Sequence, residues 1–230
     1  MREEVLEGPE QVAARAAALI AAAAPGTVAL ASSPSLRAVI AAAAVPLSSA
    51  AIWFADDRCV PGDHPESAAG FVARTLPGAA SHRIRGEDPP VEAARVYDDE
   101  IVAALGDEPI FDVVLLAAGG DGRVAGLFPE APELGERIRR AVATGDAHGG
   151  LRRVTLTLPV LNRARTTLIL ATGPDKAPAV ARARDGDLLP AARILGATWL
   201  LDEAAAAPPP LPRRRKAWEP LEGQEVLFEL

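Results

Sequence analysis

The stretch 111–129 constrains the fold of this 230-residue chain more than any other part of the sequence. It begins with an apolar run at 113–117, which is typical of a buried strand. Three of the next five residues are glycine, and glycine permits a turn whose backbone approaches a ligand closely. We expect a helix to start near Val124. A strand-to-helix turn of this kind is where open α/β sheets bind their ligands.

Similar apolar runs alternate with helical patterns along the rest of the chain. This alternation favours a mostly parallel sheet with helices on both faces, which is the α/β class. Strands are expected at 27–31, 51–55, 153–158, 167–172 and 194–201. Helices are expected at 9–24, 90–105, 132–142 and 202–207, with two more through Leu36 and from Asp175.

Composition sets the domain organisation. With 49% hydrophobic residues, 230 residues can bury one substantial core. We expect one α/β domain over 1–207, followed by a tail over 208–230 that begins with prolines and a run of basic residues.

Charge and apolar content bear on the partners of the protein. A net charge of −7 and 4% aromatic residues argue against nucleic-acid binding, which depends on phosphate neutralisation and base stacking. Apolar runs long enough to span a bilayer are lacking, so a cytoplasmic protein without a membrane partner is expected. The single cysteine, Cys59, excludes a disulfide framework and a cysteine-based zinc site.

Polar residues follow several of the predicted strands. They occur at 32–35, 56–58 and 119–123, and a fourth group is Arg153 with Lys176. Because parallel strands end at one edge of a sheet, we expect these groups to converge there. Together they supply two carboxylates and four cations, which suit a phosphate or carboxylate on a small metabolite. The carboxylates are Asp56 and Asp121, and the cations are Arg58, Arg123, Arg153 and Lys176.

Five segments of the chain resemble the 6-phosphogluconolactonase family, which is related to glucosamine-6-phosphate deaminase. The resemblance runs from about residue 9 to 207. Residues 56–64 are similar to the family's Asp-Glu-Arg-Cys-Val-Pro-x-Asp-His, and 111–129 resemble its Phe-Asp…Gly-x-Asp-Gly-His…Leu-Phe-Pro segment. The other three segments are Arg153–Thr157 with Leu161-Asn162, Gly173–Ala177, and Thr198-Trp199 to Asp202.

The resemblance implies a Rossmann-like three-layer α/β/α sandwich that hydrolyses 6-phosphogluconolactone without a metal or a cofactor. It places the anionic end of the substrate on Arg153, Lys176, Gly120 and the 32–35 loop, which includes Ser32, Ser33 and Ser35. As a mechanistic hypothesis, we expect Arg58 and Arg123 to face the lactone carbonyl, with Asp56 and Asp121 orienting these cations and a water. The oligomeric state is left open.

The chain departs from the family pattern at the candidate site. The family's general-base histidine is Arg123 here, and a guanidinium has no acceptor with which to activate water. The family's phosphate loop, Gly-Gly-x-Thr-Pro, aligns with 32–36, where both glycines are lost. The asparagine of its Asp-x-x-Ser-Asn motif is Ala68.

Three interpretations remain open. The protein is still a lactonase with another base, for which His148 and Asp56 are candidates. Alternatively, it acts on a different sugar acid or lactone and uses Arg123 to bind an anionic group. In the third, it binds a sugar phosphate or a protein partner without catalysis.

Overall fold

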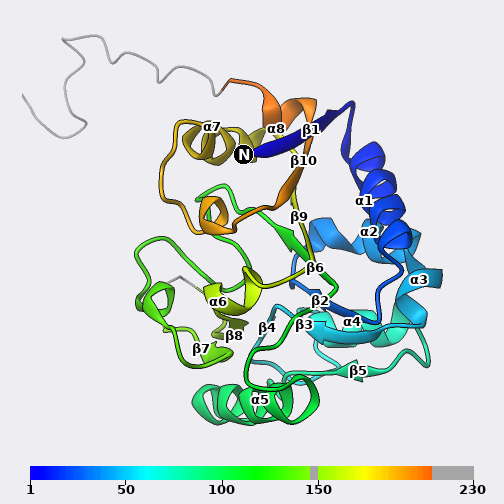
Figure 1. Ribbon diagram of the computed structural model, residues 1–230, viewed down its shortest axis with the longest axis vertical. Coiled ribbons are helices and arrows are strands. Elements are labelled where there is room, and N and C mark those ends of the chain that lie inside the picture. Colours follow the sequence, from blue (N-terminus) through cyan, green and yellow to red (C-terminus); the bar gives the residue numbers. More distant parts are fainter. Residues whose placement is uncertain (146–149, 209–230) are drawn as a thin grey trace, which may run out of the picture.

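A computed structural model of the chain describes residues 1–145 and 150–208 (Figure 1). Within these residues a seven-stranded sheet has the order β1-β10-β9-β6-β2-β3-β5. Every pair of neighbouring strands in it is parallel, so the predicted α/β class is confirmed. The strands are β1 (Arg2–Leu6), β2 (Thr27–Leu30), β3 (Ala51–Phe54), β5 (Ser81–His82), β6 (Val113–Ala117), β9 (Thr166–Ala171) and β10 (Thr198–Asp202).

Helices lie on both sides of this sheet. In Figure 1 α1, α2 and α3 lie on the right of the sheet, and α6 lies on the left. This arrangement gives the three layers that the sequence predicts. The helices are α1 (Pro9–Ala23), α2 (Arg37–Ala42), α3 (Ala44–Ser48), α4 (Ala68–Thr75), α5 (Pro90–Leu105), α6 (Leu158–Leu161), α7 (Ala177–Arg184) and α8 (Glu203–Ala206).

A second, three-stranded sheet was not expected from the sequence. It consists of β4 (Asp56–Arg58), β8 (Arg153–Leu156) and β7 (Ala141–Ala143), in that order and antiparallel throughout. Only Ala55 separates β4 from β3, so the chain passes directly from the large sheet into the small one. Residues 56–58 follow β3 as expected, although they form a strand of their own. The expectation that Arg153 lies at the carboxyl end of a strand is wrong, because it is the first residue of β8.

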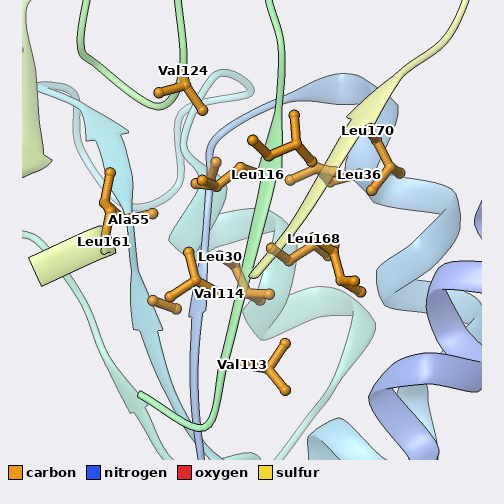
Figure 2. Packing of buried hydrophobic residues seen from close by; sticks show 14 of the residues in the cluster. Leu30, Leu36, Ala55, Val113, Val114, Leu116, Val124, Leu161, Leu168 and Leu170 are labelled. Atoms are coloured by element: carbon orange, nitrogen blue, oxygen red, sulfur yellow. The ribbon is translucent and has the colours of Figure 1, made fainter. Parts of the chain in front are cut away.

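The core fills the space between the large sheet and the layers that cover it (Figure 2). Val114 on β6, Leu30 on β2 and Leu168 on β9 are each at most 1% exposed. Such strands are apolar on both faces because helices cover both sides of a parallel sheet. This is why they could be recognised from the sequence as uninterrupted apolar runs.

The helix expected from Val124 is absent. Instead, Val124 forms isolated bridges with Ala118 and Leu127, and Ala125 adopts a positive φ of 50°. A helix starting here would meet Pro129 within its first two turns, where proline removes a backbone donor and clashes with the preceding turn. The segment folds as bridged turns that keep Val124 fully buried.

Three other element boundaries also differ from the expectation. Residues 132–142 are not one helix but a 3₁₀ turn at Pro132–Gly135 followed later by β7, because Pro132 and Gly135 favour a short turn. The strand expected at 153–158 ends at Leu156, because α6 begins at Leu158 with a proline in its first turn. The last strand begins at Thr198 rather than at 194, after a positive φ at Gly196.

Helix α5 holds the small sheet in place. Asp98 on α5 is 8% exposed and accepts hydrogen bonds from the backbone N–H groups of Arg140, at 2.5 Å, and Ala141, at 3.1 Å. Its other oxygen lies 2.6 Å from Nη2 of Arg140. The end of β7 is thus tied to a helix at the lower edge of Figure 1.

Candidate active site

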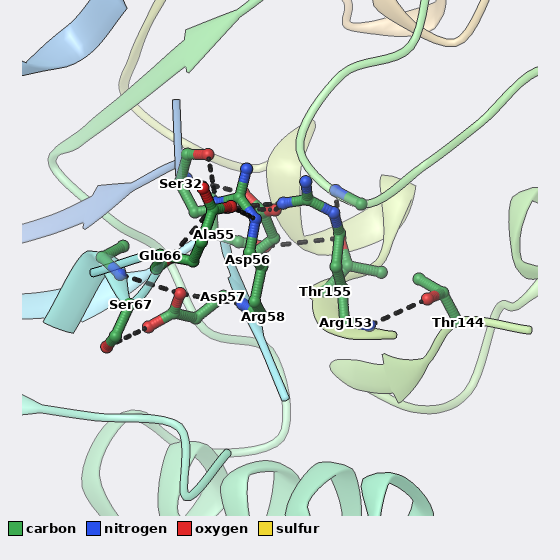
Figure 3. Close-up of polar contacts among 12 residues, drawn as sticks. Ser32, Ala55, Asp56, Asp57, Arg58, Glu66, Ser67, Thr144, Arg153 and Thr155 are labelled. Carbon is green, nitrogen blue, oxygen red and sulfur yellow. Dashed lines mark hydrogen bonds and ion pairs between the residues drawn. The ribbon is translucent and has the colours of Figure 1, made fainter. Parts of the chain in front are cut away.

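A buried carboxylate joins the two sheets. Asp56, the first residue of β4, is 1% exposed. Its Oδ1 accepts a hydrogen bond from the backbone N–H of Ser32 at 2.8 Å. Its Oδ2 accepts from the Ser32 hydroxyl and from Nη1 of Arg153, both at 2.7 Å (Figure 3). Because both oxygens are engaged, this carboxylate is poorly placed to take a proton from water.

Arg58, two residues along β4, lies beside the same cluster (Figure 3). Its Nε is 2.6 Å from a carboxylate oxygen of Glu66, and its Nη1 donates to the backbone oxygens of Ser32, at 3.4 Å, and Glu66, at 3.2 Å. Burial and the nearby positive charge of Arg153 lower the pKa of Arg58. Arginine nevertheless stays protonated, so two cations lie close together here and favour an anionic ligand.

Asp57 acts on the opposite face of β4, because successive side chains of a strand point to opposite sides. Its carboxylate accepts hydrogen bonds from the N–H groups of Arg58, Ala68 and Ala69, at 2.8, 2.9 and 3.1 Å, and from the Ser67 hydroxyl at 3.2 Å. Burial raises its pKa, against the lowering effect of these bonds. Asp57 was not predicted as a functional residue from the sequence. The Ser67 cap at the start of α4 was the signal available for it.

The glycine turn after β6 places Asp121 and Arg123. Oδ1 of Asp121 accepts the backbone N–H of Arg123 at 3.0 Å, and its Oδ2 lies 3.2 Å from Nη1 of Arg123. The guanidinium also lies over the ring of Phe128, 5.3 Å from its centroid. A Cβ on Gly119 would come within 2.6 Å of Cγ of Arg123, so this turn needs glycine for its side chains to fit.

Two further loops complete the site. The loop between β2 and α2 carries Ser33 and Ser35, whose hydroxyl oxygens are 2.8 Å apart. The loop after β9 carries Lys176, whose Nζ contacts the carboxylate of Asp175. Asp202 at the end of β10 fixes this second loop by accepting the N–H of Gly173 at 2.9 Å.

These loops surround a cavity of about 260 Å³. Eight of the eleven candidate site residues line it: Ser32, Ser33, Ser35, Asp56, Arg58, Arg123, Arg153 and Lys176. Among its described lining residues, four are cations and only Asp56 is a carboxylate. The expected convergence on one positively charged cavity is therefore present in the structure, although Arg58 and Arg153 reach it from the small sheet.

The other three candidates lie elsewhere. Asp121 is outside the lining and supports Arg123 from behind. Gly120 is exposed, and a Cβ there would lie 2.6 Å from the backbone oxygen of Asp175, which gives it a packing role between two loops. His148 lies outside the described residues.

Neither a metal site nor a membrane-spanning helix is present in the described parts of the chain. No group of three or more His, Cys, Asp and Glu side chains is placed there to hold a metal ion. In residues 1–145 and 150–208, none of the helices combines the length and apolar character needed to cross a bilayer.

Comparison with known families identifies the kind of protein that carries this cavity. Residues 3–201 match the family described as glucosamine-6-phosphate isomerases/6-phosphogluconolactonase. The chain belongs to this family. The match covers all strands of both sheets except the ends of β1 and β10.

Curated relatives within the glucosamine-6-phosphate isomerase/6-phosphogluconolactonase family share the sequence over most of the domain. The chain is 40% identical over 171 residues to the 6-phosphogluconolactonase of Homo sapiens, covering 67% of this chain and 66% of the human protein. It is 39% identical over 186 residues to that of Bos taurus, covering 72% of each. The chain thus spans about two thirds of the length of the human relative.

Solved structures show the same fold at lower identity. The crystal structure of 6-phosphogluconolactonase from Leishmania guyanensis has a TM-score of 0.79 at 21% identity, covering 89% of this chain and 97% of that one. A monomeric glucosamine-6-phosphate deaminase has a TM-score of 0.74 at 18% identity, covering 90% and 99%. Both branches of the family therefore share this architecture.

Proposed function

We propose that this protein hydrolyses the lactone ring of 6-phosphogluconolactone, or of a closely related phosphorylated lactone, to the sugar acid. The observation that carries the proposal is the cavity between the sheets, into which four cations converge, two from loops of the large sheet and two from strands of the small sheet. The 6-phosphogluconolactonases among the relatives support the choice of substrate. We further propose that residues 1–207 form the catalytic domain and 208–230 a separate tail, of which 209–230 lie outside the described residues.

The phosphate is assigned to Lys176, Arg153 and the hydroxyl groups of Ser33 and Ser35. Cations and hydroxyl donors are groups that bind phosphate oxygens in proteins, and here two loops and strand β8 supply them. Arg153 is well suited to this position because Asp56 and Ser32 fix one end of its guanidinium at 2.7 Å each. The side chain therefore enters the cavity already ordered.

The lactone carbonyl is assigned to Arg58 and Arg123. Water attacks the carbonyl carbon, the negative charge on its oxygen is held by the guanidinium groups, and the ring C–O bond then breaks. The ring oxygen takes a proton to become a hydroxyl, and the acid formed loses its proton to solvent. Removing one such donor in other enzymes costs about 10²–10³ in rate, so electrostatic stabilisation alone gives substantial catalysis.

A second candidate function is binding of a sugar phosphate without turnover. It is favoured by the state of Asp56, which is the only carboxylate among the described lining residues and is fully hydrogen-bonded. Arg123 cannot act as the general base in place of Asp56, because a guanidinium has no hydrogen-bond acceptor. A general base is worth about 10²–10⁴ in rate, so a site that lacks one favours binding over turnover.

A dehydrogenase-coupled lactonase assay, corrected for spontaneous ring opening, separates the two functions. The wild type is expected to exceed the spontaneous rate, and Lys176→Met to raise KM by about tenfold or more through the lost phosphate contact. Arg182→Met is the matched control, because Arg182 is exposed and pairs with Asp187 outside the cavity. Saturable binding of 6-phosphogluconate with no rate above background would refute hydrolysis and support binding.

The variant Arg123→His tests the role of the arginine in the same assay. A large gain in kcat would mean that the site lacks a base that histidine restores. A loss would mean that the guanidinium has its own part in the reaction.

A further inference from the structure

Positive charges outnumber negative charges in the lining of the cavity. Its described lining carries four cations and one carboxylate, a balance of three positive charges. The other carboxylates that pair with these cations lie outside the lining. Glu66, Asp121 and Asp175 have side chains that are 52%, 42% and 68% exposed, so solvent weakens their pairing.

A phosphate monoester does not balance this charge alone. At neutral pH it carries about −1.5 to −2. A phosphorylated lactone has no other charge, whereas the acid produced by ring opening has a carboxylate in addition. The ring-opened acid therefore approaches the three positive charges of the lining, and the lactone leaves about one of them without a counter-charge.

Arg123 is the cation best placed to take the carboxylate. Arg153 already shares its charge with the buried Asp56, whose side chain is 2% exposed. Lys176 presents a point charge, while the planar guanidinium of Arg123 matches both oxygens of a carboxylate. It is also ordered before a ligand arrives, by Asp121 at 3.2 Å and by the ring of Phe128.

We propose that Arg123 is a specificity-determining residue that binds the carboxylate of a phosphorylated sugar acid. The site then holds the ring-opened acid more tightly than a ligand of the same length that lacks the carboxylate. Only the identity of this acid rests on the proposed function. If the protein hydrolyses the lactone, the enzyme is inhibited by its own product.

Calorimetric titration with two matched ligands tests the proposal. The probes are 6-phosphogluconate and glucitol 6-phosphate, which carry the same phosphate and hydroxyl groups and differ at C1, where the second has CH₂OH. The wild type is expected to bind the acid at least about tenfold more tightly, which corresponds to ~1.4 kcal/mol. Arg123→Met should reduce this preference to within about twofold and leave the Kd of glucitol 6-phosphate nearly unchanged.

Two further variants complete the experiment. Arg123→Lys keeps the charge but loses the paired N–H donors of the guanidinium, so its preference for the acid should be intermediate. Arg182→Met should bind both ligands as the wild type does. Circular dichroism of each variant checks that it is folded. Equal binding of the two ligands by the wild type, binding of neither, or an equal weakening of both by Arg123→Met would overturn the proposal.

The lactonase assay distinguishes this proposal from the proposed function. A preference for the acid without lactone turnover would refute hydrolysis but uphold the role of Arg123. Turnover without any preference would refute the role of Arg123 but uphold hydrolysis. Inhibition of the wild type by 6-phosphogluconate, reduced in Arg123→Met, is the result expected if both hold.

Discussion

Asp56 and Arg153 depend on each other, because each is nearly buried and each would be left charged without the other. Their side chains are 2% and 13% exposed, and the pair links a strand of the small sheet to the loop after β2. Ion pairs of this kind add little net stability over an apolar pair, but breaking one by removing a single partner is costly. Their value here is to hold a cation in position.

Arg153→Met is therefore expected to lower the free energy of unfolding by about 3–5 kcal/mol, measured by urea titration. The double variant Arg153→Met/Asp56→Asn removes the stranded charge and should recover part of this loss. If the single and double variants are equally unstable, the buried charge is not the cause.

Cys59 lies beside Arg58 in the sequence, but its thiol is expected to be unreactive. Burial, together with the negative charge of Asp57, raises its pKa to about 11. Only about one thiol in a thousand is then ionised at pH 8, compared with roughly a quarter at an ordinary pKa of about 8.5. Alkylation by iodoacetamide at pH 8 should be about 200-fold slower in the folded protein than in urea. Equal rates would contradict this.

At the scale of elements, the glycine turn after β6 fixes the position of Arg123. A Cβ on Gly119 would come within 2.5 Å of Oδ1 of Asp121 and 2.6 Å of Cγ of Arg123. Gly119→Ala is expected to lower kcat/KM by about tenfold or more, because small displacements in a site have large effects on rate. Gly135→Ala is the control, since no atom lies within 4 Å of its added Cβ. Equal activity of both variants would show that the turn tolerates the shift.

Helix α4 depends on Asp57, whose buried carboxylate accepts the N–H groups of Ala68 and Ala69. Asp57→Asn places amide hydrogens against these donors and should cost about 1–3 kcal/mol. Because the pKa of Asp57 is raised in the folded state, that state binds the proton more tightly than the unfolded chain, whose pKa is about 3.9. Its contribution to stability is present at lower pH and is lost as the pH rises through the folded pKa.

Urea unfolding at several pH values from about 3.5 upward measures this dependence. The stability difference between the wild type and Asp57→Asn should narrow as the pH rises, since only the wild type loses this contribution. A difference that widens would mean that the hydrogen bonds outweigh burial and lower the pKa.

Five strands of the large sheet, β2, β3, β6, β9 and β10, could be predicted from the sequence because they are apolar on both faces. The two edge strands could not, because β1 is mostly charged and β5 consists of only Ser81 and His82. The small sheet could not, because β4 consists of Asp56, Asp57 and Arg58, which have no apolar pattern at all. The pairing of β4 with β8, distant in the chain, forms that strand. The strand β4 is therefore formed by tertiary pairing and not by the local sequence pattern.

The candidate site was predicted in part for the right reason. The loops after β2, β6 and β9 do lie at the carboxyl ends of parallel strands, so Ser33, Arg123 and Lys176 converge as the topology requires. Arg153 reaches the same cavity as the first residue of an antiparallel strand, which no strand-end rule could indicate. Asp57 was missed because its effect passes through a helix rather than the cavity.

At the scale of the whole molecule, the cavity lies where two sheets of different kinds meet. The large parallel sheet supplies three of its loops, and the small antiparallel sheet supplies Arg58 and Arg153. The small sheet is itself held by α5 through Asp98 and Arg140. The residues that line the cavity are spread along the chain between 32 and 176, so most of the domain has to be folded before the cavity exists.

Because side chains alternate along β4, this strand connects a ligand bound in the cavity with helix α4 on its other side. Asp56 and Asp57 are adjacent, yet one faces the cavity and the other clamps the first turn of α4. A bound sugar phosphate that steadies one face of this strand also steadies the other. Saturation with 6-phosphogluconate should thus slow deuterium uptake at the amides of Ala68 and Ala69, followed by mass spectrometry, while α1, which contributes no residue to the cavity lining, exchanges as before. Unchanged uptake would show that the strand transmits nothing, and slowed uptake would make the helix a distant reporter of a filled cavity.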